Sequence, residues 1–264
     1  MLCFGLPTLI EVPTLRESAA LCRRLGLRFI ELNMSFPQNG LDRLDERELR
    51  AVKEEFGLFY TVHIDESTDP CSVNPRIAAV YRGDMRKTVA LARSLEIPTL
   101  NMHLLRGVYA TLPDRRVYIY EVSEDEYLAN MRVFRDEMTE AVGDSAVRIC
   151  LENTDGYDLP FLPRALDLLL ESPAFGLTFD IGHDHALGGI DEPLILARGE
   201  RLRHMHMHDG LGTRVHLALG DGEMDIPRFL RLAEAHGCRV VLETKTVAAL
   251  EKSVAWPRER GYMA

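Results

Sequence analysis

Histidines occupy alternate positions in one short segment, RHMHMHDG at residues 203–210. Alternation with a period of two is typical of a β-strand, and it would place His204, His206 and His208 on one face and the two methionines on the other. Imidazole is a common ligand of divalent metals. The segment therefore predicts a strand whose polar face serves metal chemistry, provided that other ligands reach the same place.

Other strand-like runs carry polar residues at alternate positions in the same way. In FYTVHI, residues 59–64, apolar side chains alternate with Thr61 and His63. The polar residues near the carboxyl end of such a run are Glu31, Asn33, His63, Asn101, His103, Glu152, Asp180, His206 and Glu243. A buried core would not select these residue types, so their common position indicates a shared site.

Carboxylates and imidazoles gathered at a place of low dielectric constant repel or desolvate one another unless a cation joins them. A lone strand histidine is more commonly a structural residue, so the inference depends on convergence of several strand ends. A divalent metal is the simplest explanation if six of these residues meet: His63, His103, Glu152, Asp180, His206 and Glu243. His206 would then lie at ligand height, His204 one layer deeper and His208 at the rim.

The elements that must position these side chains are eight strand-like runs alternating with amphipathic stretches. The runs cover residues 2–9, 27–34, 57–64, 98–105, 147–153, 175–183, 203–209 and 239–245. The predicted helices include 14–25, 45–56, 76–95, 124–141, 161–170 and 225–236. Thr14 and Asp225 are expected N-caps, and Gly26, Gly57 and Gly237 are expected stop signals.

Eight βα units without a linker or low-complexity insert predict an α/β protein with a single (β/α)8 TIM barrel spanning residues 1–264. In such a barrel the active site lies at the C-terminal end of the strands, where the listed polar residues would converge. A doubly wound open sheet is the main alternative fold. No glycine-rich GxGxxG turn follows the first strand, which disfavours that alternative.

Composition excludes several classes of partner. The chain carries 31 Lys and Arg against 41 Asp and Glu, a formal net charge of −10, which disfavours nucleic acid and anionic membranes. No run of eighteen apolar residues and no secretory signal pattern is present, so we expect a soluble cytoplasmic protein. The five cysteines are odd in number and never spaced as CxxC, which indicates neither a disulfide framework nor a thiolate zinc site.

Five motifs resemble a known family in their order and strand positions: LEN at 151–153, FDIGH at 179–183, HMHD at 206–209, HLALGDGEMD at 216–225 and LET at 242–244. The chain resembles the xylose-isomerase-like barrels, which include sugar phosphate isomerases and epimerases and the endonuclease IV enzymes. The epimerase branch, which HLALGDGEMD fits well, implies one divalent ion, Mn²⁺, Zn²⁺, Co²⁺ or Mg²⁺. Its implied ligands are Glu152, Asp180, His206 and Glu243.

The same resemblance implies roles around the metal. Glu152 and Glu243 would be the catalytic acid/base pair that moves a proton at the carbon beside a carbonyl, a reaction that also needs stabilisation of the enediolate oxygen. His183 and His216 would face the sugar oxygens. Arg214 would offer a positive charge near the mouth. The expected partner is a small-molecule sugar substrate, and a homo-oligomer is compatible with the sequence.

The endonuclease branch uses three zinc ions, and the match to it is incomplete. His63 and His103 stand where that branch keeps histidines for its first metal, so a second ion at this pair is a further alternative. Without a second ion, we expect both histidines to bind substrate. His183 and His216 match two ligands of the third metal. The remaining ligand of that metal is an aspartate, and this chain has Arg214, which cannot ligate a cation.

Four functions remain open at the level of sequence. The favoured one is a metal-dependent isomerase or epimerase of a sugar, sugar phosphate or polyol. The alternatives are an endonuclease IV-like phosphodiester hydrolase acting on abasic DNA, a keto-polyol dehydratase of the same barrel family, and a barrel that binds metal without turnover. The loops at 33–44, 65–75 and 105–123 are expected to form much of the lid over the pocket.

Overall fold

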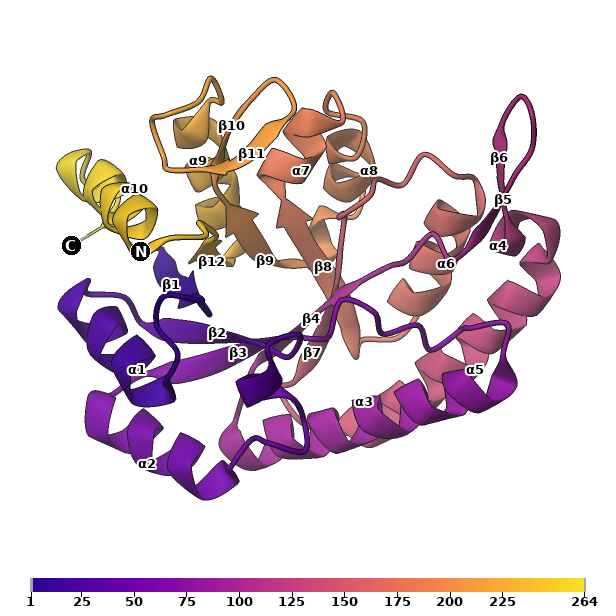
Figure 1. Ribbon diagram of the computed structural model, residues 1–264, viewed down its shortest axis with the longest axis horizontal. Helices are drawn as coiled ribbons and strands as arrows, with labels where there is room; N and C mark the ends of the chain where they lie inside the picture. Colours follow the sequence, from indigo (N-terminus) through magenta and orange to yellow (C-terminus); the bar gives the residue numbers. More distant parts are fainter. Residues whose placement is uncertain (1, 264) are drawn as a thin grey trace.

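The computed structural model describes residues 2–263, in which eight parallel strands close into a barrel (Figure 1). Around the barrel the strands follow the order β1, β12, β9, β8, β7, β4, β3, β2. Their bounds are Cys3–Pro7 (β1), Phe29–Asn33 (β2), Phe59–His63 (β3), Thr99–His103 (β4), Arg148–Glu152 (β7), Phe175–Asp180 (β8), Leu202–Met207 (β9) and Arg239–Leu242 (β12). The predicted (β/α)8 fold is confirmed, and the open-sheet alternative is wrong.

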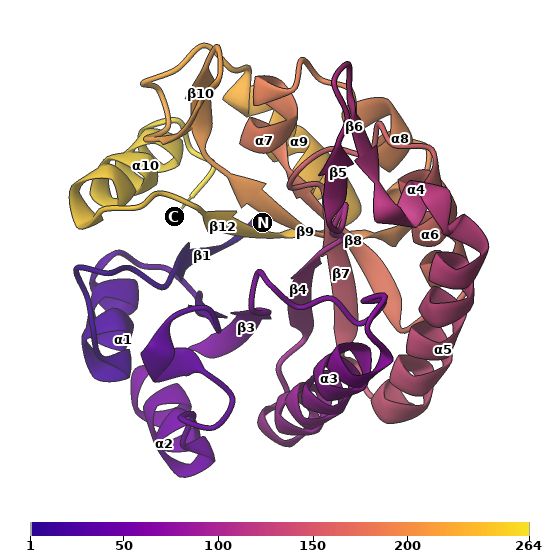
Figure 2. The same ribbon diagram turned by 45° about the vertical axis from the view of Figure 1, so that its right-hand side comes forward.

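Helices surround the strands (Figure 2). The longer ones are α1 (Leu15–Arg24), α2 (Glu46–Phe56), α3 (Pro75–Leu95), α5 (Glu124–Val142), α6 (Phe161–Leu170), α9 (Ile226–His236) and α10 (Val247–Glu259). The shorter ones are α4 (Ile119–Val122), α7 (Ile181–Ala186), α8 (Glu192–Leu196) and the 3-10 turns η1 (Pro37–Asn39) and η2 (Gly199–Arg201). All six predicted helices are observed to within one residue at either end. The sequence patterns did not predict α10 or the short helices.

Local capping chemistry sets the helix ends as the sequence predicts. Thr14 caps α1 because its side chain accepts a hydrogen bond from the backbone N–H of Glu17, and the Glu17 carboxylate in turn accepts one from the backbone N–H of Thr14. Asp225 caps α9. Helices α2 and α9 end at Gly57 and Gly237, whose φ angles of 65° and 63° lie in the left-handed region that glycine adopts without strain.

The strand register brings the predicted polar residues to one level. Asn33 pairs with His63, His103 with Glu152, and Asp180 with His206 across neighbouring strands. Met205 and Met207, at the opposite parity of β9, are fully buried in the apolar core. Alternate residues of a strand face opposite sides, so the polar parity points into the barrel at its C-terminal end.

Two short hairpins extend the barrel, one within the predicted loop at 105–123 and one after the predicted strand at 203–209. One joins β5 (Tyr109–Thr111) to β6 (Arg116–Tyr118) and projects beyond α4 (Figure 1). The other joins β10 (Asp209–Leu211) to β11 (Arg214–Leu217), directly after β9. Within residues 2–263, none of the helices is both long and apolar enough to cross a membrane.

Candidate metal centre

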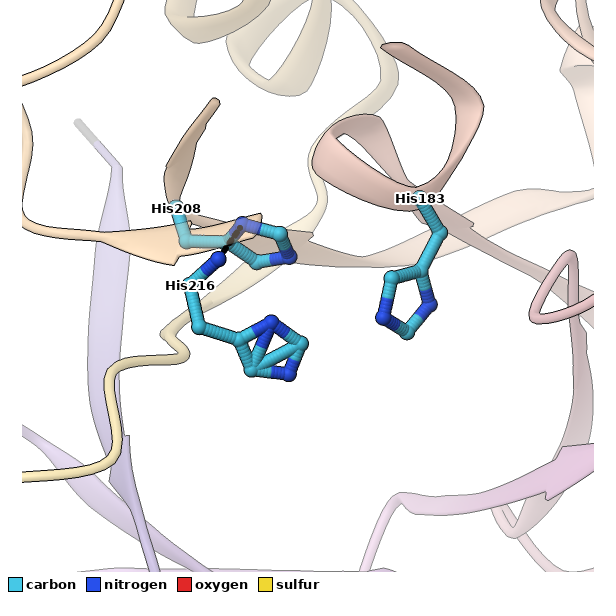
Figure 3. A group of neighbouring side chains, drawn as sticks. All are labelled: His183, His208 and His216. Carbon is cyan, nitrogen blue, oxygen red and sulfur yellow. Dashed lines mark hydrogen bonds between the residues drawn. The ribbon is translucent and has the colours of Figure 1, made fainter. Parts of the chain in front are cut away.

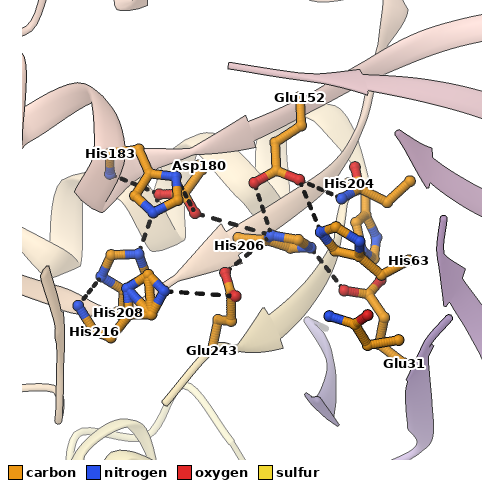
Figure 4. A network of polar contacts seen from close by, with 12 residues as sticks. Glu31, His63, Glu152, Asp180, His183, His204, His206, His208, His216 and Glu243 are labelled. Atoms are coloured by element: carbon orange, nitrogen blue, oxygen red, sulfur yellow. Dashed lines mark hydrogen bonds and ion pairs between the residues drawn. The ribbon is translucent and has the colours of Figure 1, made fainter. Parts of the chain in front are cut away.

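Four of the predicted ligands meet at the C-terminal mouth of the barrel (Figure 4). Each offers one ligand atom, and these atoms all lie within 4.8 Å of one another. The four residues are Glu152 at the end of β7, Asp180 at the end of β8, His206 in β9 and Glu243 directly after β12. All are buried. The convergence inferred from strand parity is therefore present in the structure.

The carboxylates surround a single ring nitrogen, Nδ1 of His206. This atom lies 3.0 Å from Oε2 of Glu243, 3.3 Å from Oε1 of Glu152 and 3.9 Å from Oδ2 of Asp180. Within residues 2–263, His206 Nδ1, Asp180 Oδ2 and Glu243 Oε2 are buried and have no well-aligned hydrogen-bond partner. Buried polar atoms normally have partners. A divalent cation would satisfy these atoms, and the mixed nitrogen and oxygen donor set fits Mn²⁺, Co²⁺ or Zn²⁺.

The charge state of the metal-free cluster follows from the same geometry. Burial lowers the pKa of His206, but attraction to Glu152, Glu31 and Glu243 outweighs it and holds that pKa well above its ordinary value. Burial raises the pKa values of Glu152 and Glu243, but the neighbouring His206 brings both well below the ordinary value. A proton on His206 therefore takes the place that a cation would otherwise occupy.

Glu31, one of the polar strand-end residues, has a role in the site that the sequence did not assign. Its Oε1 atom lies 2.8 Å from Nε2 of His206, and its Oε2 atom lies 2.8 Å from Nε2 of His204. Thr61 donates a further hydrogen bond to Oε2, at 2.8 Å. A carboxylate on the far nitrogen of a metal-binding imidazole fixes the ring and its tautomer. The inward parity of Glu31 in β2 was the available signal, and the deeper position predicted for His204 is observed.

The predicted second-ion pair lies on the other side of Glu152. Nε2 of His63 and Nε2 of His103 are each 3.4 Å from Glu152 Oε2, to which Asn101 donates a hydrogen bond. His63 Nδ1 lies 2.8 Å from the backbone carbonyl of Ile64, which requires a proton on Nδ1. Nε2 then faces a carboxylate oxygen and needs a second proton or a cation. A second ion at this pair stays a prediction.

His183, His208 and His216 form a further group (Figure 3) whose nearest ring atoms lie within 4.8 Å of one another. The prediction that His208 lies at the rim is wrong, because its side chain is fully buried. Gly182 in α7 packs directly on the His208 ring, and the backbone N–H of His216 in β11 donates a hydrogen bond of 2.8 Å to its Nδ1. The helix and the hairpin that cover His208 both lie outside the repeating strand pattern.

The other predicted site residues reach the mouth to different extents. His183 Nδ1 lies 3.5 Å from Asp180 Oδ2, and His216 Nε2 lies 3.7 Å from Glu243 Oε1. Burial, with a further contribution from the nearby ammonium of Lys245, lowers the pKa of His216 to about 3, so its ring is neutral. The Arg214 side chain is exposed on β11, and its predicted contact with substrate stays a prediction.

Lys245 is a second residue that the sequence did not assign. Its Nζ atom lies 2.6 Å from Oε1 of Glu243, and its side chain is more than half exposed at the mouth. This contact occupies the Glu243 oxygen that faces away from His206. Position 245 follows Glu243 by two residues, so the same face of an extended segment was the available signal.

Solved structures of low sequence identity share this architecture. A D-tagatose 3-epimerase-like protein is 21% identical, with a TM-score of 0.77, and the match covers 98% of this chain and 96% of that chain. A D-allulose 3-epimerase from Methylomonas sp., solved in complex with D-allulose, is 17% identical with a TM-score of 0.75 over 98% of this chain and 96% of its own. An AP endonuclease, family 2, from Brucella melitensis is 16% identical with a TM-score of 0.70 over 98% and 99%.

Structures of such low sequence identity show the fold alone, and a family model identifies the family. It matches residues 19–261, which is nearly the whole chain, and it describes the xylose isomerase-like TIM barrel. The barrel order, the four converging ligands and this match agree with the resemblance carried by the five sequence motifs. The chain belongs to the family of xylose isomerase-like TIM barrels.

Proposed function

We propose that the protein is a metal-dependent isomerase or epimerase that moves a proton at the carbon beside the carbonyl group of a sugar. One observation carries this proposal. Glu152 and Glu243 come from different strands and direct one carboxylate oxygen each to the same point, 3.3 Å and 3.0 Å from His206 Nδ1. Two carboxylates on different sides of one bound substrate are what a paired proton removal and return requires.

The residues that would hold the metal are Glu152, Asp180, His206 and Glu243. When bound there, a divalent cation supplies positive charge that stabilises the enediolate oxygen during proton transfer. The protein fixes the two glutamates by their outer oxygens, because Asn101 donates to Glu152 Oε2 and Lys245 contacts Glu243 Oε1. The inner oxygens are thereby left to face the centre, where the metal and the substrate would meet.

The chemistry assigned to the glutamates is a proton relay. One carboxylate removes the proton from the carbon next to the carbonyl, and the other returns a proton to the opposite face or to the adjacent carbon. Return to the opposite face is epimerisation, and return to the adjacent carbon is isomerisation. His183 and His216 border the same mouth and donate hydrogen bonds to substrate hydroxyl groups. The solved epimerase bound to D-allulose supports a ketose as substrate.

A phosphodiester hydrolase is the second candidate. The approach of His63 and His103 to a single oxygen of Glu152 favours it, because two imidazoles and one carboxylate are the ligand types that a second cation would need. The similarity to an AP endonuclease also favours it. The net charge of −10 opposes it, since binding to duplex DNA relies on neutralising phosphates.

Exchange of substrate hydrogen for deuterium separates these functions. The protein is incubated with Mn²⁺ and a panel of ketoses in D₂O, and deuterium at the carbon beside the carbonyl is measured by NMR. The proposal expects exchange that Glu152→Gln and Glu243→Gln each reduce by roughly 10²- to 10⁴-fold. Nicking of abasic DNA without any exchange would favour the hydrolase, and loss of water from a keto-polyol would favour the dehydratase.

A further inference from the structure

His208 has no role in the proposed proton transfer, yet it is fully buried beside a metal ligand. Its Nε2 atom lies 3.1 Å from Oδ1 of Asp180. Its Nδ1 atom accepts a hydrogen bond of 2.8 Å from the backbone N–H of His216 (Figure 3). The imidazole thus stands between the β10–β11 hairpin and the carboxylate at the end of β8 (Figure 4).

The backbone contact decides which ring nitrogen of His208 carries the proton. Nδ1 also lies 3.3 Å from the backbone carbonyl oxygen of Asp209, but its shorter contact, 2.8 Å, is with the His216 N–H. A backbone N–H can only donate, so Nδ1 offers its lone pair to that shorter contact. The neutral ring then carries its proton on Nε2, the atom that faces Asp180. For the same reason His208 has no free lone pair for a cation, and the group formed by His183, His208 and His216 does not complete a three-histidine metal site.

The contact also decides which oxygen of Asp180 remains available. Oδ1 accepts a hydrogen bond of 2.7 Å from the backbone N–H of His183, in addition to facing His208 at 3.1 Å. Oδ2 is buried, has no well-aligned partner within residues 2–263, and faces His206 Nδ1 at 3.9 Å. The hydrogen bond from His183 and the close approach of His208 Nε2, which is not aligned as a hydrogen bond, both fall on Oδ1. Together they orient the carboxylate so that Oδ2 is presented to the centre.

Two backbone features maintain this arrangement. A Cβ atom at position 182 would lie closer than 3.0 Å to three atoms of the His208 ring, so only glycine leaves room for it. His216 has a φ angle of 61°, which is uncommon for a residue other than glycine and persists where the surrounding structure fixes it. At this angle the His216 N–H points at His208 Nδ1. Both features concern the placement of one imidazole.

We propose that His208 is a positioning residue for Asp180, held in its Nε2–H tautomer by the backbone N–H of His216, and that it fixes Oδ2 as the oxygen offered to the metal. This inference rests on the proposed function, because it requires a metal at the four-ligand centre. It also links the substrate-facing hairpin to the metal ligand through one hydrogen bond. Removal of an orienting partner of a ligand typically weakens metal binding by roughly 10- to 100-fold.

The first experiment compares His208→Gln with His208→Leu. The dissociation constants of Mn²⁺ and Co²⁺ are measured by chelator competition, and the visible absorption of the Co²⁺ protein reports the coordination geometry. A glutamine can donate to Asp180 and accept from His216, so it should bind metal within a few-fold of wild type with an unchanged spectrum. Leucine fills the space without either contact and should lose roughly 10- to 100-fold in affinity. Met207→Leu, on the opposite face of β9, is the control and should match wild type.

The second experiment moves His208 without changing it. Gly182→Ala should displace the His208 ring and weaken metal binding as much as His208→Leu does. In a His208→Ala background, adding Gly182→Ala should cause no further loss of metal affinity. This variant also serves if His208→Leu fails to fold. Wild-type affinity in both His208→Leu and Gly182→Ala would overturn the inference, and so would a His208→Gln protein that binds as poorly as His208→Leu. A wild-type protein that binds neither Mn²⁺ nor Co²⁺ would instead contradict the proposed function and the inference together.

Discussion

Nε2 of His206 lies 2.8 Å from Oε1 of Glu31, on the side of the ring away from the three carboxylates that surround Nδ1. The two residues come from β9 and β2, which are not neighbours in the barrel, so the contact crosses its interior. A carboxylate in this position keeps the ring proton on Nε2 and makes Nδ1 a stronger ligand. Metal affinity should therefore depend on Glu31 although it is not a ligand itself.

Glu31→Gln should weaken binding of Mn²⁺ or Co²⁺ by roughly 10- to 100-fold, because the amide removes the charge that raises the basicity of His206. The measurement is the dissociation constant by chelator competition. Thr61→Val is the matched control, since it removes a neutral donor to Glu31 and keeps both imidazole contacts. Equal losses in the two variants would show that packing around Glu31, rather than its charge, controls the site.

Asp180→Ala and His206→Ala should each abolish metal binding at the four-ligand centre. Both side chains are fully buried, and each supplies an atom that faces the other ligands without a hydrogen-bond partner in residues 2–263. Metal content per chain is measured after dialysis against a weak chelator. Circular dichroism checks that the variants fold. Undiminished metal content in both folded variants would contradict the assignment of the ligands.

Most of this site could be predicted because its information is local. A strand alternates faces with a period of two, so polar residues at alternate positions of β3, β4, β7, β8 and β9 identify the inward parity without any knowledge of neighbours. The closed barrel then brings strand ends to one level, and the register pairs His103 with Glu152 and Asp180 with His206. The helix ends were equally local, since Thr14 and Gly57 act on the adjacent turn.

The role of Glu31 and the burial of His208, which the sequence did not predict, depend on contacts between distant elements. The role of Glu31 requires β2 and β9 to face each other across the barrel, which no periodicity reports. His208 continues the alternation of β9 and therefore suggested a rim position, but α7 and the β10–β11 hairpin cover it. Both elements are shorter than the patterns on which a sequence prediction relies.

Metal binding should release about one proton per ion near neutral pH. In the metal-free protein, Glu152 and the other carboxylates hold the pKa of His206 well above its ordinary value despite burial, so its Nδ1 carries a proton that the cation must displace. Glu152 and Glu243 have no proton to release, because His206 keeps their pKa values low. Titration calorimetry in phosphate and in Tris buffer measures the released proton, and identical observed enthalpies in the two buffers would contradict the prediction.

The raised pKa of His206 also determines the direction of two pH effects. Metal affinity should fall roughly tenfold for each pH unit below the raised pKa of His206, because the proton competes with the cation. Stability of the metal-free protein should change in the opposite sense. A raised folded-state pKa contributes stability that is fully present below the unfolded value of 6.5 and is lost as the pH rises through the folded value. Melting temperatures of apo protein across this range test the second effect.

His216 and Arg214 distinguish an isomerase from a three-metal hydrolase. His216 Nε2 lies 3.7 Å from Glu243 Oε1, and its ring is neutral, so we expect it to hydrogen-bond substrate rather than metal. His216→Asn is the suitable variant because asparagine tolerates the left-handed φ of 61° and keeps the backbone N–H on His208. It should retain metal and lose roughly 10- to 100-fold in kcat/KM, the effect of one substrate hydrogen bond.

Arg214→Asp supplies the complementary test. Residues 214 and 216 are two positions apart in β11 and therefore have the same strand parity. We expect a carboxylate at 214 to join His183 and His216 as a third metal ligand, whereas the wild-type guanidinium cannot ligate a cation. We expect this variant to bind about one more zinc ion per chain than wild type and to turn over sugar more slowly, because a cationic donor near the mouth becomes an acid. Arg214→Gln, which removes the charge without adding a ligand, should lose turnover without gaining zinc. Should the wild-type protein itself bind three zinc ions and cleave abasic DNA, another group must replace the missing aspartate, and the proposed isomerase or epimerase function fails.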